Sequence, residues 1–227
     1  MFLSKLTINV FSREFRRDNA DIQDMHRTIM SAFPQVDNDQ PARMAHGVLW
    51  RLDEAPRGFV LYVQSRSEPD WSYLPDDYLA EPAQVRDLQP ALDAVAPGRH
   101  LAFRLTANAT RTIHPGGTPG QRKNGKRVAH RDPRAQVAWL ARQGERHGFV
   151  LPLAANGQPD VVPSPRPVLQ GRQKKGPDRH TIRIEAIRFD GRLVITDRDA
   201  FLHALQYGIG KGRAYGCGLI SLAALQN

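Results

Sequence analysis

A run of closely spaced glycines near the C-terminus constrains the fold of this chain more than any other stretch. Residues 208–218 read Gly-Ile-Gly-Lys-Gly-Arg-Ala-Tyr-Gly-Cys-Gly. Glycine has no Cβ, so this backbone can adopt positive φ and approach another chain closely. Exposed backbone N–H groups beside a lysine and an arginine also suit a phosphate. The residues before the run (199–205) indicate a helix, and those after it (219–222) indicate a strand.

Two nucleotide-binding motifs are excluded by the order of these elements. A Walker loop follows a strand and ends in Gly-Lys-Ser/Thr, whereas here Lys211 is followed by Gly212 and a helix comes first. A Rossmann fingerprint opens a helix, whereas this run precedes a strand. A tight helix-to-strand turn without a ligand remains open on loop chemistry alone. In a basic protein, the pattern favours bound nucleic acid over a nucleotide cofactor.

The distribution of charge also indicates a polyanionic partner. Lysine and arginine number 32 against 23 aspartates and glutamates, a net charge of +9. Between Arg111 and His180 there are fourteen basic and four acidic side chains, so the excess is concentrated in this block. An arginine-rich block of this kind favours a polyanion over a small acidic substrate. A basic face that is merely solvated is the alternative.

Composition excludes several other classes of protein. With 227 residues the chain can form one large domain or two small ones. We expect no membrane association and a cytoplasmic location, because no apolar run reaches spanning length and the N-terminus lacks a signal-peptide pattern. The single cysteine, Cys217, excludes an intramolecular disulfide and a multi-cysteine zinc site, and we expect it to pack beside the glycines. No metal-ligand cluster of histidines and carboxylates is visible.

The first half of the chain predicts a ferredoxin-like βαββαβ unit over residues 1–94. Asp18, Asn19 and Asp21 offer capping residues and first-turn acids for one helix of about four turns, which Pro34 ends. The arginines before these acids fall in a polar connection. Strands are predicted over residues 2–10, 45–52, 58–65 and 85–88.

The pattern then restarts and predicts a second βαββαβ unit over residues 95–227. A strand at 100–107 extends towards Ile113, a mobile loop covers 115–130, and a helix starts at Asp132. Residues 181–187 and 193–195 predict a hairpin that turns at Asp190-Gly191, a strong turn dipeptide. The last helix, the glycine run and the final strand complete the unit. The predicted fold class is therefore α+β, with two tandem ferredoxin-like (RRM-like) domains.

Taken together, these features resemble a known family. The chain is similar to the CRISPR repeat-RNA endoribonucleases of the CasE family, which are members of the RAMP superfamily in the subtype I-E Cascade complex. The stretches that carry the resemblance occur in the family's order along nearly the whole length, and they are residues 2–5, 25–26, 31–34, 103–108, 136–140 and 208–222.

This resemblance implies a reaction and its partners. It implies cleavage of precursor CRISPR RNA within the repeat stem-loop, without a metal or a small-molecule cofactor. The 2′-hydroxyl before the scissile phosphate attacks it and leaves a cyclic phosphate and a 5′-hydroxyl. The product then stays with the enzyme and joins other Cascade subunits. A non-catalytic RNA-binding subunit on the same scaffold is the alternative function.

The resemblance also assigns residues to the reaction. His26 matches the family's catalytic histidine, although helical spacing alone favours a core histidine. Gln23 stands where the family commonly has tyrosine, and glutamine is a poor proton-transfer group, so its role is doubtful. Arg27 can clamp the RNA backbone or stabilise the transition state; an exposed helix arginine is the alternative.

Two basic segments are assigned to RNA binding. Lys211 and Arg213, with Gly210 and Gly212, are expected at phosphates flanking the cut. The resemblance also implies a basic hairpin against the repeat stem-loop, and A-form RNA, which offers shape, 2′-hydroxyls and phosphates more than base edges, fits that role. Its residues are Arg166, Arg172, Lys174, Lys175 and Arg179. A further cluster, interpreted as a solvated loop, consists of Arg122, Lys123, Lys126 and Arg127.

Overall fold

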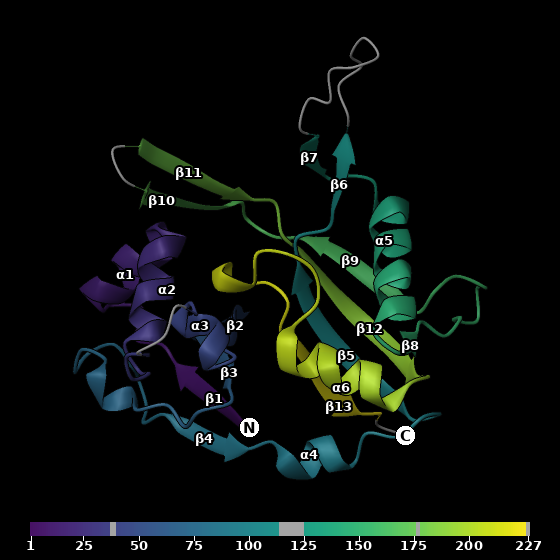
Figure 1. Ribbon diagram of the computed structural model, residues 1–227, viewed down its shortest axis with the longest axis horizontal. Coiled ribbons are helices and arrows are strands. Elements are labelled where there is room, and N and C mark those ends of the chain that lie inside the picture. Colours follow the sequence, from purple (N-terminus) through teal and green to yellow (C-terminus); the bar gives the residue numbers. More distant parts are fainter. Residues whose placement is uncertain (37–39, 114–124, 176–177, 226–227) are drawn as a thin grey trace.

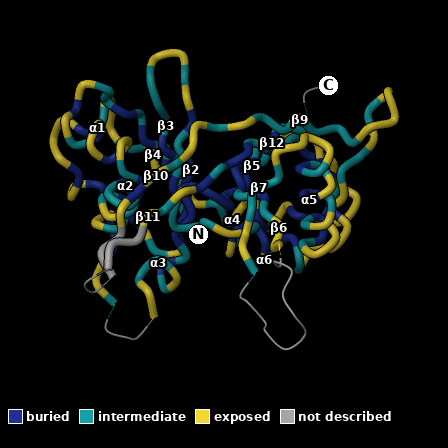
Figure 2. Tube along the Cα trace, turned by 90° about the horizontal axis from the view of Figure 1, so that it is seen from above, coloured by how far each residue is buried: buried dark blue, intermediate teal, exposed yellow. Residues whose placement is uncertain are grey.

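The computed structural model describes residues 1–36, 40–113, 125–175 and 178–225. Two antiparallel sheets lie side by side, one built from the first half of the chain and one from the second (Figure 1). Seen from above, each forms a lobe with buried residues inside it (Figure 2). Each lobe has its own hydrophobic core. The predicted α+β class with two ferredoxin-like units is confirmed.

The first unit has the strand order β2-β3-β1-β4, which is the order of a ferredoxin-like βαββαβ sheet. Its elements are β1 (Phe2–Thr7), α1 (Arg13–Ala20), α2 (Ile22–Met30), α3 (Ala42–Ala45), β2 (Leu49–Ala55), β3 (Gly58–Ser65), η1 (Trp71–Tyr73) and β4 (Gln84–Asp87). The stretch between β3 and β4, where the second helix of such a unit belongs, holds only the 3₁₀ turn η1. Prolines at positions 69, 75 and 82 disfavour a continuous helix there.

The prediction of a single first helix is wrong, because the chain forms two helices in tandem. Ser12 caps α1 by accepting a hydrogen bond from the Phe15 N–H at 3.3 Å. Asp21 is extended, with φ of −133°, so it ends α1 and begins α2. Its carboxylate accepts from the Gln23 N–H at 2.9 Å, as expected for an N-cap. The early arginines therefore lie in α1 rather than in a polar connection.

The second unit has the strand order β13-β5-β12-β8, with β9 also pairing with β12. Its elements are α4 (Gln89–Asp93), β5 (His100–Ala107), β6 (Thr110–Ile113), β7 (Lys126–Ala129), α5 (Pro133–Arg146), β8 (Phe149–Val150), β9 (Val161–Pro165), β10 (Leu169–Lys175), β11 (Asp178–Ile184), β12 (Ile187–Ile195), α6 (Arg198–Tyr207), η2 (Arg213–Tyr215) and β13 (Ile220–Ala224). Leu92 of α4 and Val95 pack in this second core. Two hairpins, β6–β7 and β10–β11, project from the unit on the same side (Figure 1).

The predicted hairpin at Asp190-Gly191 is wrong. Both residues lie inside β12, which pairs with β5 on one side and with β9 on the other. A Cβ at Gly191 would collide with the carbonyl oxygen of Asp160, so glycine here admits a neighbouring strand rather than a turn. The partner of β11 is instead β10. Residues 126–129 form β7, where a loop was predicted, while residues 115–124 of that predicted loop lie outside the described residues.

Buried polar contacts join the two sheets. The Arg51 guanidinium, 3% exposed, pairs with Asp53 at 2.9 Å and donates to the carbonyl oxygens of Arg104 and Leu219. Arg104 in turn approaches Asp53 at 3.5 Å. These bonds satisfy charges that would be costly to bury alone, and they set the position of one sheet on the other.

Candidate functional site

The glycine run forms a loop that returns from the second unit to the first. All five of its glycines have positive φ: Gly208, Gly210, Gly212, Gly216 and Gly218. The indole N–H of Trp50 in β2 donates to the Ala214 carbonyl oxygen at 3.1 Å. A Cβ at Gly216 would make a tight contact of 3.1 Å with the Trp50 ring, and the φ of 74° at this position also favours glycine. The loop, yellow in Figure 1, brings η2 against α2 of the same chain.

His26 of α2 lies where this loop meets the helix. The Tyr215 ring from η2 stands edge-on to the imidazole, with ring centroids 6.1 Å apart and an interplanar angle of 70°. The Tyr215 hydroxyl donates a hydrogen bond to Gln23 Oε1 at 3.1 Å. Gln23 and His26 are three residues apart on the helix, so they present their side chains to the same loop. The glycine loop thus places a phenol beside the predicted histidine.

The His26 ring is neutral at neutral pH. Burial and, to a lesser extent, the Arg43 charge lower its pKa from 6.5 to about 4. Its Nδ1 atom is buried and has no hydrogen-bond partner among the described residues. A neutral imidazole can accept a proton, which an imidazolium cannot.

Two arginines supply positive charge to the same cluster. Arg43 follows the start of α3 and donates to the Val48 carbonyl oxygen at 3.1 Å. Burial, together with the Arg213 charge, lowers the pKa of Arg43. Arg213 donates to the carbonyl oxygens of Gly210 and Tyr207, both at 2.9 Å, so it also holds the loop in place. Cations of this kind suit a phosphate dianion.

Arg27 does not point into this cluster. Its guanidinium pairs with Asp24 on the same helix and is 69% exposed. Asp24 also lies 3.9 Å from Arg17 of α1. The structure therefore brings α2, with Gln23 and His26, against the 3₁₀ turn that contains Arg213, and leaves Arg27 exposed and paired with Asp24.

The predicted basic hairpin corresponds to β10–β11, and it docks on the helix that carries His26. The backbone N–H of Arg172 donates to Asp21 Oδ2 at 3.2 Å. A Cβ at Gly171 would lie 2.8 Å from Asp21 Oδ1, so the strand is pressed against the start of α2. The Arg172 residue is exposed. The backbones of Lys174, Lys175 and Arg179 lie further out on the same hairpin.

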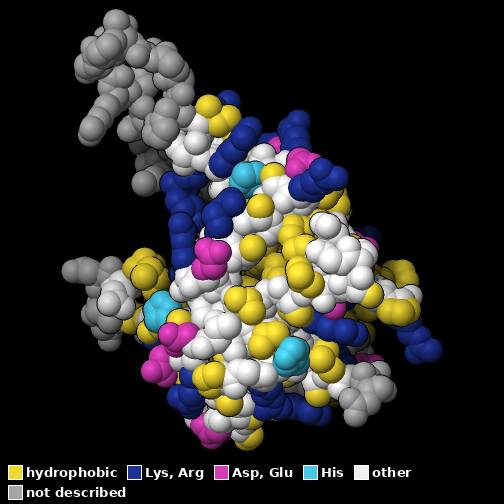
Figure 3. Space-filling view, turned by 90° about the vertical axis from the view of Figure 1, so that its right-hand side faces the viewer, with side chains coloured by type: hydrophobic (Ala, Val, Ile, Leu, Met, Phe, Trp, Pro, Cys, Tyr) yellow, Lys and Arg dark blue, Asp and Glu magenta, His cyan; other side chains and the backbone are white. Residues whose placement is uncertain are grey.

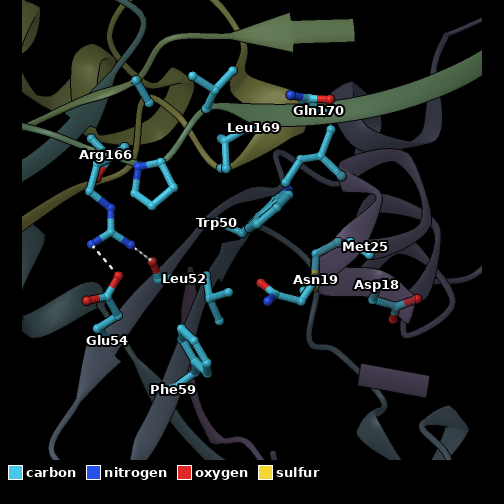
Figure 4. A pocket seen from close by; sticks show the side chains of 17 residues that line it. Asp18, Asn19, Met25, Trp50, Leu52, Glu54, Phe59, Arg166, Leu169 and Gln170 are labelled. Carbon is cyan, nitrogen blue, oxygen red and sulfur yellow. Dashed lines mark hydrogen bonds and ion pairs between the residues drawn. The ribbon is translucent and has the colours of Figure 1, made fainter. Parts of the chain in front are cut away.

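Arg166 lies apart from this hairpin, at a cavity of about 340 Å³ between the two units. Its guanidinium, 17% exposed, pairs with Glu54 at 3.3 Å and donates to the Leu52 carbonyl oxygen at 3.4 Å (Figure 4). Trp50 and Phe59 of the first sheet line the same cavity. Arg166 thus has partners within the chain, and its contact with RNA stays a prediction.

A basic groove of about 620 Å³ runs between the β6–β7 hairpin, β11 and the glycine loop. Its five basic side chains are Lys126, Arg127, Arg131, Arg183 and Lys211. Glu185 is the acid in the groove and lies 3.5 Å from both Arg131 and Arg183. Such exposed pairs are weak and leave the cations available. Figure 3 shows Lys and Arg side chains gathered beside the β6–β7 hairpin on the upper part of the molecule.

Sequence reasoning missed Tyr215, Arg43, Arg131 and Arg183. Tyr215 is the aromatic residue within the glycine run, an unusual place for a large side chain, and that was a usable signal. Arg43 had no such sequence signal, because its position depends on the short helix α3 and no sequence spacing connects it with His26. Lys126 and Arg127 belong to a strand rather than the predicted loop; Arg122 and Lys123 lie outside the described residues.

Comparison with known proteins assigns this chain to a family. The model of a family described as "CRISPR associated protein" matches residues 1–224. The chain belongs to this family.

Its similarity to individual members extends over most of their length. It is 38% identical to the CRISPR-associated endoribonuclease Cse3 of Thermus thermophilus, over 98% of this chain and 100% of that protein. It is 32% identical to the CRISPR system Cascade subunit CasE of Escherichia coli, over 79% of this chain and 90% of that one. A structure of Thermus thermophilus Cse3 bound to an RNA representing a pre-cleavage complex matches with a TM-score of 0.74 at 33% identity, covering 98% of each chain.

Two further sequence predictions can be compared with the structure. Cys217 is buried among the residues beside the loop, and burial raises the pKa of its thiol to about 12, so it packs as expected. Among the described residues, no helix combines the length and apolar character needed to cross a membrane.

Proposed function

We propose that this chain is a repeat-specific endoribonuclease that cleaves precursor CRISPR RNA within the repeat stem-loop. The 2′-hydroxyl attacks the adjacent phosphate and leaves a 2′,3′-cyclic phosphate and a 5′-hydroxyl, with no metal and no small-molecule cofactor. The product remains bound as mature guide RNA, and the enzyme joins other Cascade subunits in the cytoplasm. Support comes from family membership and from the names of the relatives, an endoribonuclease and a Cascade subunit.

The observation that carries this proposal is the neutral His26 imidazole beside a phenol and two guanidiniums. A base with a pKa of about 4 is unprotonated throughout the neutral range and can take the proton from the 2′-hydroxyl. Arg43 and Arg213 then stabilise the charge that develops on the phosphorane. The free energy of the transition state falls because these donors are already held by the Val48 carbonyl and by the loop.

RNA binding is assigned to the two hairpins that project beside the site. In this proposal the β10–β11 hairpin contacts the repeat stem through Arg172, Lys174, Lys175 and Arg179, and its contact with Asp21 aligns the stem with α2. The basic groove at Lys211 takes the backbone that leaves the stem. Arg27 has a supporting role, since its exposed guanidinium can exchange Asp24 for a phosphate.

The test is cleavage of a synthetic repeat hairpin in the presence of a chelator. We expect one cut, with a cyclic phosphate on one product and a 5′-hydroxyl on the other. A matched RNA with a 2′-deoxy sugar before the scissile phosphate should bind equally well and remain intact. Binding of the unmodified RNA without cleavage would contradict the enzyme assignment and favour the non-catalytic RNA-binding subunit.

A further inference from the structure

The cleavage reaction moves two protons, and the second has no donor so far. The proton of the 2′-hydroxyl goes to His26 in the proposed function, while the leaving 5′-oxygen needs a proton from elsewhere. We propose that the Tyr215 hydroxyl donates this proton, so that a residue of the glycine loop is the general acid. This inference rests on the proposed function.

The loop is built to hold Tyr215 in one place. The residues on either side of η2, Gly212 and Gly216, have φ of 82° and 74°, which only glycine adopts readily. The Trp50 indole fixes the Ala214 carbonyl immediately before the tyrosine. The backbone conformation of the loop therefore sets the position of the Tyr215 ring beside α2.

Gln23 directs the phenol without taking part in proton transfer. Its Oε1 atom accepts the Tyr215 O–H at 3.1 Å, and an amide neither gives nor takes a proton near neutral pH. The His26 ring lies edge-on to the same phenol, with ring centroids 6.1 Å apart, so the candidate base and the candidate acid are neighbours. Gln23 is a positioning residue, because it acts through Tyr215.

Tyr215 carries the proton that the step requires. Burial raises the pKa of its phenol, so the O–H stays protonated up to strongly alkaline pH. Arg43 and Arg213 are guanidiniums, which do not release a proton under these conditions. Tyr215 thus differs from the nearby cations in having a proton to give.

The step balances without a co-reactant. The bond from the 2′-oxygen to phosphorus forms as the bond from phosphorus to the 5′-oxygen breaks. His26 gains the proton of the 2′-hydroxyl, and the 5′-oxygen gains the proton of Tyr215. Exchange with water then reprotonates the phenolate and deprotonates the imidazolium, and nothing is oxidised or reduced.

A sulfur leaving group tests this role directly. Two repeat RNAs are compared in single turnover, one natural and one with sulfur replacing the bridging 5′-oxygen, because a thiolate leaves without a proton. Tyr215→Phe should slow cleavage of the natural RNA by roughly 10²–10⁴-fold and cleave the sulfur RNA at nearly the parent rate. His26→Ala should be slow on both RNAs, since the base is still needed.

A double variant separates chemistry from folding. Gln23 is the hydrogen-bond partner of the Tyr215 hydroxyl, so Gln23→Tyr puts a phenol on α2 next to residue 215. Gln23→Tyr combined with Tyr215→Phe should therefore regain much of the missing rate. Binding of the 2′-deoxy RNA should be equal in all variants, which shows an intact site.

Two results would overturn the inference. If Tyr215→Phe cuts the natural RNA as fast as the parent, or is equally slow on both RNAs, Tyr215 is not the acid while the proposed function stands. If the parent itself binds the repeat and cuts neither RNA, the proposed function fails and the inference fails with it.

Discussion

The two sheet units of this protein share one strand order and differ in what they present to a ligand. In the first unit the described residues 66–83, between β3 and β4, form no α-helix, and α2 carries His26 and Gln23. The second unit has both helices and adds two hairpins and the glycine loop, which together hold most of the excess arginine and lysine. The proposed base, His26, belongs to the first unit, and the glycine loop that packs beside it belongs to the second.

This difference shows how the site is divided between the two units. A helix of the first unit provides a partly buried histidine, and burial together with the Arg43 charge keeps its imidazole neutral at neutral pH. The second unit provides a tyrosine, an arginine and a basic groove, and its loop closes over the helix. Substitutions can therefore change the contribution of one unit to the site and leave that of the other unit in place.

Removing the base should have the largest effect. His26→Ala is expected to slow single-turnover cleavage by about 10²–10⁴-fold, because no group replaces the proton acceptor. Affinity for the 2′-deoxy RNA should be unchanged. His100→Ala, at an exposed position of β5, is the matched control. If His26→Ala cleaves as fast as the control, His26 is not the base and the first unit provides no proton acceptor.

The junction of the sheets should have the next largest effect. Arg51→Met leaves Asp53 buried with only the more distant Arg104, so the free energy of unfolding should fall by about 3 kcal/mol. Urea denaturation measures this change. Arg51→Met combined with Asp53→Leu should recover most of it, because no charge is left unpaired. A single variant as stable as the parent would mean that the sheets are joined by apolar packing alone.

Neutralising the basic groove should weaken binding without changing the chemistry. Arg183→Gln with Lys211→Gln should reduce the slope of log affinity against log salt by roughly 0.7–0.9 for each phosphate that the groove no longer neutralises. The cleavage rate of saturated enzyme should hold. Arg86→Gln, an exposed arginine of β4 on the first sheet, is the control and should leave the slope as it is. An unchanged slope in the groove variant would contradict a backbone contact there.

The smallest effect concerns the pH at which cleavage begins. His26 accepts a proton only when neutral, so kcat/KM of the parent should rise through pH 4 and then level off. Arg43→Met removes a charge that opposes protonation, which should move this rise to higher pH, towards 6.5. Burial is the larger cause of the low pKa, so the shift should be partial. Movement to lower pH, or none, would show that Arg43 does not act on His26.

Several elements of the fold could be predicted from local pattern. The first strand follows from alternation. Asp21, which caps α2, is one of three residues offered together as caps or first-turn acids. The wrong predictions share one cause: a glycine or a polar residue that looked like a local signal instead contacts a distant part of the chain. Gly191 follows a favourable turn residue, but its missing Cβ admits Asp160 and β9. The break between α1 and α2 depends on an extended Asp21 that also holds the hairpin through Arg172.

The sequence by itself determined where the backbone needs glycine and that His26 stands on a helix, because backbone preference and helical spacing are local properties. The tertiary structure decided what surrounds that histidine. Tyr215 bonds Gln23 across 192 residues of sequence, and this contact exists only because the two sheets pack on the Arg51 network and the Trp50 indole holds the loop. No local sequence pattern predicts a contact between residues so far apart in the chain, because it depends on how the two units pack against each other.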